Sequence, residues 1–218
     1  MEILELMQKR HSVRAYKSTP VEAEKRATLE TLIADINQKA GLHIQAIWDD
    51  ERCFDSFIAR YGKFSGVQNY IALVGKKSPS LDETLGYYGE QIVLTAQGLG
   101  LNTCWVAMTH GKSRAVCEKG ERAVCLIALG YGATEGVPHK SRPMGEVCRH
   151  EGEMPEWFCQ GVEAALLAPT AMNQQKFCFE ITPDGKVRAT CGSGFYTKLD
   201  LGIVRYHFEK VTGVRTER

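Results

Sequence analysis

Residues 81–99, LDETLGYYGEQIVLTAQGL, carry the strongest helical pattern in the sequence. Apolar side chains recur there at steps of three and four residues, namely Leu85, Tyr88, Ile92, Ala96 and Leu99, with Val93 and Leu94 beside them. This spacing predicts an amphipathic helix. Its apolar stripe is wide enough to pack against two neighbours, which favours both a sheet and a second protein surface as its partners.

Short apolar runs on both sides of this helix predict the strands. The runs 70–75, 101–107 and 122–129 are typical of buried strands. A further strand is expected at 42–48, and a hairpin at 176–181 and 187–191 around the turn residues Pro183-Asp184-Gly185. Further helices are expected at 20–38, 49–60, 112–119, 155–167 and 199–211, and a long loop at 130–153.

Strands and helices alternate along the chain, but without a strict βαβ order. This indicates the α+β fold class, with one mixed β-sheet flanked by helices. The sequence contains no repeats and no convincing linker, so a single domain over residues 1–218 is expected.

Composition excludes several classes of protein. A net charge of +1 and a pI of about 7.6 argue against a nucleic-acid partner, and no apolar run has the length of a membrane span. Glu2 and Glu5 interrupt the first apolar turn, so no signal peptide is expected. The eight cysteines form no Cys-x-x-Cys pair and the six histidines show no ligand spacing, so we expect no metal site. The cysteines are expected to be free thiols in a reducing cytoplasm.

The segment Lys9–Tyr16, KRHSVRAY, concentrates anion-binding chemistry. Arg10 and Arg14 are fixed cationic forks that suit a phosphate, and the hydroxyl of Ser12 can donate to an oxygen. His11 lies between them. The alternative is that these basic residues are simply solvated.

Two loops downstream offer matching chemistry. HKSRP, at 139–143, places Lys140 and Arg142 next to the end of a predicted strand. APTAMNQQ, at 168–175, contains a hydroxyl and three side-chain amides, which suit a planar heterocycle or a polyol. Taken singly, each segment is more often an ordinary loop. The glycine-rich stretch 130–136 is not a dinucleotide fingerprint, because its spacing is wrong and prolines follow where a helix should begin.

Five blocks together resemble the FMN-dependent nitroreductase family, over most of the chain. They are RHSVRAY at 10–16, GLGLNTCW at 98–105, LGY at 129–131, KSR at 140–142 and APTAMNQQ at 168–175. The resemblance implies a nitroreductase-like α+β homodimer with FMN at the subunit interface. It also implies a set of cofactor-binding residues: Arg10, His11, Ser12, Arg14, Lys140, Arg142, Pro169, Thr170, Asn173 and Gln175.

The resemblance implies that Arg10, Ser12, Lys140 and Arg142 bind the phosphate and ribityl chain, with His11 and Arg14 beside them. Asn173 and Gln175 match the family's amides that reach the flavin ring or the ribityl hydroxyls. Backbone groups near Trp105 to Thr109 face the ring. The resemblance further implies that FMN takes electrons from NADH or NADPH and passes them to a nitroaromatic, quinone or similar small molecule by a ping-pong mechanism. The flavin carries this chemistry, so no catalytic side chain is expected.

The sequence departs from the usual family pattern in three ways. The blocks occur in a permuted order, Gln175 is followed by Lys176-Phe177 in place of Pro-Trp, and no counterpart of the usual Glu-Gly pair is found. These differences keep two alternatives open. One is a flavin-binding protein for storage or sensing without NAD(P)H turnover, and the other is a different flavin reaction on the same fold.

Overall fold

The structure is a computed structural model that describes residues 2–150 and 152–217. Its contacts divide the chain into two compact units. The antiparallel-sheet unit consists of Lys9–Leu81 and Ile92–Pro138, and the mixed-sheet unit of Met1–Gln8, Asp82–Gln91 and His139–Arg218. Each unit is built from segments that are far apart in the sequence.

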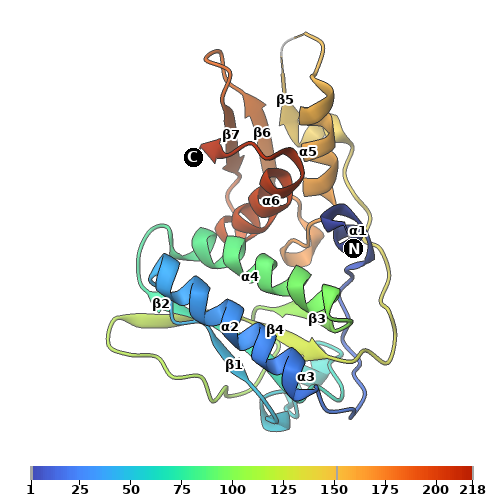
Figure 1. Cartoon of the computed structure of the whole chain (residues 1–218), viewed down its shortest axis with the longest axis vertical. Coiled ribbons are helices and arrows are strands. Elements are labelled where there is room, and N and C mark those ends of the chain that lie inside the picture. The colour runs from blue at the N-terminus through green and yellow to red at the C-terminus, as the bar shows by residue number, and fades with distance from the viewer. Residues whose placement is uncertain (1, 151, 218) are drawn as a thin grey trace. The chain divides into compact units, whose positions relative to one another are not determined.

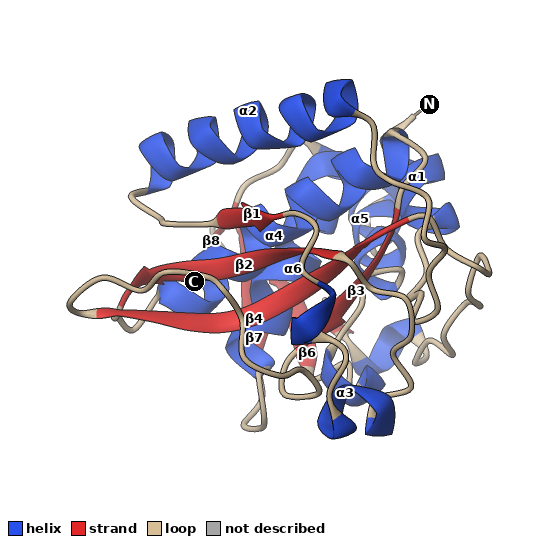
Figure 2. Ribbon diagram, turned by 90° about the horizontal axis from the view of Figure 1, so that it is seen from below, coloured by secondary structure: helices blue, strands red, loops and turns tan. Residues whose placement is uncertain are grey.

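The antiparallel-sheet unit is built on four strands in the order β1-β2-β4-β3. The strands are β1 (Gln45–Ile47), β2 (Asn69–Lys76), β3 (Asn102–Val106) and β4 (Glu121–Gly130), and every neighbouring pair is antiparallel. The two central strands, β2 and β4, have pairs on both sides and are buried along most of their length, as their continuous apolar runs predict. Helix α2 (Ala23–Ala40) lies along the β1 side of this sheet (Figure 2).

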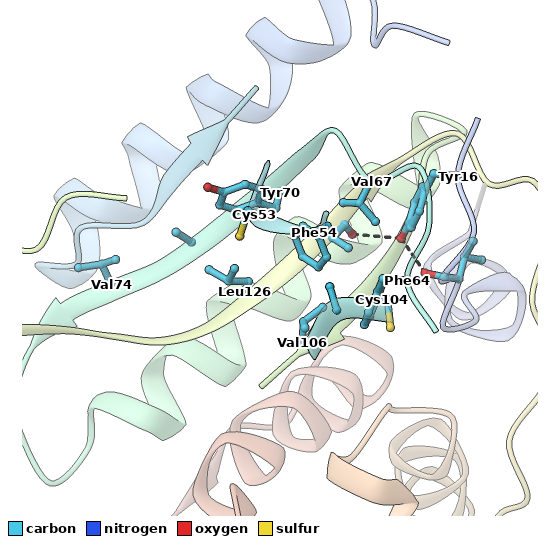
Figure 3. Packing of buried hydrophobic residues seen from close by; sticks show 14 residues of the cluster. Tyr16, Cys53, Phe54, Phe64, Val67, Tyr70, Val74, Cys104, Val106 and Leu126 are labelled. Atoms are coloured by element: carbon cyan, nitrogen blue, oxygen red, sulfur yellow. Dashed lines mark hydrogen bonds between the residues drawn. The ribbon is translucent and has the colours of Figure 1, made fainter. Parts of the chain in front are cut away.

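The core of this unit gathers buried side chains from the sheet and from the segments around it (Figure 3). The Tyr16 hydroxyl donates to the carbonyl of Val13 at 2.7 Å, within the cluster. Burial raises the pKa of Tyr16 well above its usual range, so this donor stays protonated. Tyr70 donates to Asp50 at 2.7 Å and accepts from the backbone N–H of Arg114 at 3.0 Å. The phenols of Tyr16 and Tyr70 thus both have hydrogen-bond partners inside this unit.

The mixed-sheet unit has a second four-stranded sheet in the order β5-β6-β7-β8. Its strands are β5 (Cys148–Arg149), β6 (Phe177–Ile181), β7 (Val187–Cys191) and β8 (Thr216–Glu217). The central β6/β7 pair is the predicted antiparallel hairpin, whereas the two outer pairs are parallel. Helices α5 (Glu156–Leu166) and α6 (Thr197–Thr212) pack against each other beside this sheet (Figure 1). Phe179 of β6 stacks on Phe208 of α6, with ring centroids 4.6 Å apart.

Helix α4 (Leu81–Gly98) is the amphipathic helix predicted from the apolar stripe at 81–99. Its residues Asp82–Gln91 belong to the mixed-sheet unit, where they cross α6 at two glycines. A Cβ atom at Gly86 would lie 2.0 Å from the carbonyl oxygen of Leu199, and one at Gly202 would lie 2.0 Å from that of Glu83. The two backbones are therefore in direct contact, which no larger residue at these positions allows.

The remaining elements are short. They are α1 (Ile3–Lys9), α3 (Phe57–Tyr61) and the 3-10 turns η1 (Glu51–Cys53), η2 (Met144–Glu146) and η3 (Ala171–Asn173).

The α+β class is confirmed, but several details of the expected arrangement are wrong. The strands form two sheets and not one mixed sheet, because β5 to β8 pair only among themselves. The expected helix at 49–60 is split into η1 and α3, since the Ser56 hydroxyl accepts from Ala59 N–H and starts a new helix. Helix α2 begins at Ala23 and not at Pro20. The expected loop at 130–153 contains η2 and β5.

Residues 112–119 do not form the expected helix. Their backbone groups find partners elsewhere in the unit. The Gln45 side chain accepts from the N–H of Val116 at 2.9 Å and donates to its carbonyl at 2.7 Å. A polar, extended segment satisfied in this way has no need of helical hydrogen bonds.

We expect Gly202→Ala to lower the free energy of unfolding by about 3 kcal/mol, because the new methyl group meets backbone atoms that cannot turn aside. Denaturant unfolding measures the change. Gly145→Ala is the matched control, since a Cβ at Gly145 meets open space. Equal stability of both variants would show that the helices are not in backbone contact.

Candidate functional site

The ten predicted cofactor ligands fall into two groups, one in each unit. The first group lies in the antiparallel-sheet unit and contains Arg10, His11, Ser12 and Arg14. The second lies in the mixed-sheet unit and contains Lys140, Arg142, Pro169, Thr170, Asn173 and Gln175. The structure brings the members of each group together within their own unit.

The first group lies on an extended segment that follows α1. Val13 N–H donates to the carbonyl of Thr103 on β3 at 3.0 Å, and Tyr16 N–H donates to the carbonyl of Ser65 at 3.0 Å. Ala133 N–H donates to the carbonyl of Ala15 at 2.8 Å. The segment is therefore held to three parts of its unit by backbone bonds, which fixes where its basic side chains begin.

Three members of this group gather around one thiol, that of Cys104. Burial raises the pKa of Cys104, and the charges of Arg14 and Arg10 and a hydrogen bond with Ser12 oppose this rise. The thiol stays protonated at neutral pH because burial is the larger effect. Arg10 is only 3% exposed, whereas Arg14 is exposed. Two cations and a hydroxyl therefore lie around a neutral thiol, and of the two cations Arg14 is the exposed one.

His11 is held apart from this thiol. Its Nδ1 donates to the carbonyl of Glu135 at 3.2 Å. Gly136, at φ +71°, lets the loop come this close, because a Cβ there would lie 2.8 Å from that of His11. The loop is tied to β3 as well, since Gly132 N–H donates to the Asn102 side chain at 2.9 Å.

The second group is organised by the side-chain amide of Gln175, which is 2% exposed. Its Oε1 accepts from the backbone N–H of Arg142 at 2.9 Å. Its Nε2 donates to the carbonyl of Lys140 at 2.9 Å and to Oδ1 of Asn173 at 2.8 Å. One N–H donor and the oxygen of Gln175 thus fix the backbone of the basic loop, residues 139–142, and its other N–H donor holds Asn173.

Neighbouring groups fix the same loop from two more directions. Asn173 Nδ2 donates to the carbonyl of Lys140 at 2.9 Å. The carbonyl of Leu166, at the end of α5, accepts from His139 Nε2 at 2.9 Å and from the Ser141 hydroxyl at 3.2 Å. The backbone of 139–142 is therefore rigidly placed, while the side chains of Lys140 and Arg142 are exposed. Arg142 pairs with Glu146 at 3.3 Å, a surface ion pair of little energetic weight that an anionic ligand can displace.

The two other predicted residues of this group, Thr170 and Pro169, lie at the turn of residues 170–175 that carries Asn173 and Gln175. The Thr170 hydroxyl accepts from Gln175 N–H at 3.1 Å, and Pro169 is buried. Met172, Asn173 and Gln175 all have positive φ, at 52°, 53° and 44°. Left-handed residues of this kind cost free energy and are kept only where the surroundings determine them.

Sequence reasoning missed Asp200, whose carboxylate accepts from Ala171 N–H at 2.9 Å and from Gln174 Nε2 at 2.8 Å. Desolvation by burial raises its pKa from 3.8 to about 6, against the effect of these hydrogen bonds. Because the folded state holds the proton more tightly than the unfolded state, the stability it contributes falls as the pH rises from about 4 to 6. The ionised group costs about 3 kcal/mol at neutral pH.

The donors present suit a phosphorylated, hydroxylated ligand. In the antiparallel-sheet unit the arginines can supply charge for a phosphate and Ser12 a neutral donor for a hydroxyl group. In the mixed-sheet unit Lys140 and Arg142 supply charge and Asn173 a neutral donor. Metal binding has no comparable support: in residues 2–150 and 152–217, no three His, Cys, Asp or Glu side chains cluster as metal ligands would. Nor does any helix in these ranges have both the length and the apolar character needed to span a membrane.

The fold is that of solved nitroreductase structures. A "putative nitroreductase" from Thermotoga maritima MSB8 is 26% identical, with a TM-score of 0.72 over 97% of this chain and 83% of that one. A "putative nitroreductase in complex with FMN" from Desulfovibrio desulfuricans is 22% identical, with a TM-score of 0.56 over 70% of this chain and 98% of that one. A "putative NADH dehydrogenase/NAD(P)H nitroreductase" from Bacteroides thetaiotaomicron VPI-5482 is 21% identical, with a TM-score of 0.53 over 70% of this chain and 98% of that one.

The family model described as "Putative TM nitroreductase" matches residues 2–212. The chain belongs to this nitroreductase family, which confirms the resemblance found in the sequence. A search of curated proteins gave no match.

We expect Gln175→Ala to free the basic loop, because Arg142 N–H, the Lys140 carbonyl and Asn173 Oδ1 all lose their partner. The free energy of unfolding should fall by about 2 kcal/mol. Cleavage by trypsin after Lys140 should become faster, which limited proteolysis with mass spectrometry measures. Gln160→Ala, on the exposed face of α5, is the control and should leave this cleavage unchanged. An unchanged rate in Gln175→Ala would mean that the amide does not hold the loop.

Proposed function

We propose that this chain is an FMN-dependent oxidoreductase of the nitroreductase type. Electrons pass from NADH or NADPH through bound FMN to a nitroaromatic, a quinone or a similar small acceptor, by a ping-pong mechanism. The observation that carries the proposal is the Gln175-centred network, which fixes the backbone of Lys140–Arg142 and leaves both cations exposed to a ligand. Membership of the family supports it.

The related structures add support for the cofactor and the reductant. The Desulfovibrio desulfuricans structure is a complex with FMN, and the name of the Bacteroides thetaiotaomicron protein includes NAD(P)H nitroreductase. We propose the same cofactor and reductant for this chain, in a single FMN-binding domain, and a cytoplasmic homodimer with FMN at the subunit interface.

In this proposal the residues of the chain bind and orient the cofactor. Lys140 and Arg142 of the mixed-sheet unit would hold its phosphate, because cationic forks and ammonium groups suit a dianion. Arg10 and Arg14 are proposed as the cofactor-binding cations of the antiparallel-sheet unit. Ser12, Thr170 and Asn173 would bind the ribityl hydroxyls, with His11, Pro169 and Gln175 completing the lining. When bound, FMN supplies the electron-transfer chemistry. The side chains therefore act through binding and electrostatics, and none is expected to be indispensable as an acid or base.

The test of this function is the visible absorption spectrum of purified protein loaded with FMN, recorded without oxygen before and after addition of NADH or NADPH. We expect a flavin spectrum that bleaches with reduced nicotinamide and returns when a quinone or nitroaromatic is added. A flavin spectrum that stays unchanged would favour the storage or sensing alternative. A protein that does not bind FMN would contradict the proposal. Sedimentation of the same sample gives the oligomeric state, and a monomer with full flavin would contradict the interface.

Arg142→Ala is expected to weaken FMN binding about 10- to 100-fold, which corresponds to the loss of one hydrogen bond to a charged group. Quenching of flavin fluorescence measures the dissociation constant. At saturating FMN the turnover should stay close to that of the wild type, since the arginine acts through cofactor retention. Arg149→Ala, on β5 in the same unit, is the control. Unchanged FMN affinity in Arg142→Ala would remove the phosphate role.

A further inference from the structure

Asp200, in the first turn of α6, is a buried acid outside the predicted ligand set. One carboxylate oxygen accepts from the backbone N–H of Ala171 and the other from the side chain of Gln174. The two donors flank Met172 and Asn173, which have left-handed backbones. The carboxylate therefore binds the turn on both sides of the two left-handed residues.

Gln174 also connects the turn to the segment that precedes α6. Its Nε2 also donates to the carbonyl of Phe195 at 2.7 Å, so both of its N–H groups have acceptors. An amide at position 200 offers one acceptor oxygen where a carboxylate offers two. With Asn at this position, either Ala171 N–H or Gln174 loses a bond, and turning the Gln174 amide over would sacrifice the bond to Phe195.

The turn held in this way is the one that carries Asn173 and Gln175. Their side chains fix the backbone of the basic loop through the carbonyl of Lys140 and the N–H of Arg142. Two sets of hydrogen bonds, joined by the backbone of the turn, thus connect α6 with the backbone of Lys140 and Arg142, and every member lies in the mixed-sheet unit.

We propose that Asp200 is a positioning residue for the cofactor site: its ionised carboxyl group fixes the 170–175 turn and, through Asn173 and Gln175, the Lys140–Arg142 loop. This inference rests on the proposed function, since the loop matters to FMN only if FMN binds there.

The cost of the buried charge agrees with such a role. Burial raises the pKa of Asp200, so the ionised form is kept at neutral pH against its own desolvation. Cys191 of β7 interacts electrostatically with Asp200, and the same thiol also interacts with Glu83 of α4 and Lys198 of α6. A polar network that opposes stability in this way is often retained for function.

The test compares wild type with Asp200→Asn, a variant of almost the same shape. Without FMN, hydrogen exchange of the amides of Ala171, Arg142 and Gln175 should be about tenfold faster in the variant, as expected for the loss of one hydrogen bond. The dissociation constant for FMN should rise by a similar factor. Removing a negative charge would by itself strengthen the binding of a dianion, so a weaker affinity separates positioning from charge.

The pH dependence gives a second readout. The second ionisation of a phosphate ester also lies near pH 6, so affinity falls on acidification in both proteins. Only the wild type has Asp200 to protonate, and the ratio of the two dissociation constants should therefore be about ten at pH 7.5 and close to one at pH 5. A ratio that does not change with pH would contradict the role of the ionised group.

Two further variants serve as a control and as a substitute for Asp200→Asn. Glu163→Gln, which removes an exposed acid of α5, should match the wild type in exchange and affinity. If Asp200→Asn does not fold, Gln174→Ala tests the other end of the same bond and should produce the same faster exchange and weaker binding.

The outcomes separate the two proposals. A wild type that binds FMN, with an Asp200→Asn variant unchanged in exchange and affinity, overturns this inference alone. A wild type that does not bind FMN rejects the proposed function and the inference with it.

Discussion

The mixed-sheet unit depends on one close contact, the crossing of α4 and α6 at Gly86 and Gly202. With no side chain at either position, the helix backbones touch, and this sets how far along α4 the helix α6 can slide. Asp200 lies two residues before Gly202, and Leu199 supplies the carbonyl that faces Gly86. Because the crossing fixes the position of α6 along α4, it also fixes the position of the Asp200 carboxylate that binds the 170–175 turn. The packing of two helices and the geometry of a loop are consequences of the same constraint.

Buried polar contacts make this arrangement specific. His207, which is fully buried in α6, donates through Nδ1 to the carbonyl of Ala164 on α5, and its Nε2 lies 2.9 Å from Glu90 on α4. One imidazole therefore joins three helices of the unit. A slip of α6 along either partner would leave these groups buried without their bonds, which costs more than a lost apolar contact.

Much of the fold could be predicted because it depends on local patterns. The stripe of residues 81–99 gave α4 almost to the residue, and the hairpin around Asp184 was found from its turn signal. The division into two sheets could not be predicted, since it depends on which strand edges meet. The expected helix at 112–119 failed for a similar reason: Gln45, some 70 residues away in the chain, binds its backbone.

The candidate site shows the same limit. The amide-rich block and the basic loop stand out in the sequence, but the function of an amide depends on its partners, and Gln175 has both N–H donors on protein atoms. Asp200 gave no signal, because an acid in the first turn of a helix is common. Its role depends on a loop that ends 25 residues earlier in the chain.

The interleaved segments have a consequence for synthesis on the ribosome. All parts of the antiparallel-sheet unit lie between residues 9 and 138, so its strands can pair while the rest of the chain is still being made. The mixed-sheet unit needs residues 82–91 and also β8, at 216–217, so it can close only after residue 217 has emerged. Contacts between segments so far apart form slowly. Residues 82–91 of α4 therefore have their apolar side uncovered in the nascent chain until α6 has been made.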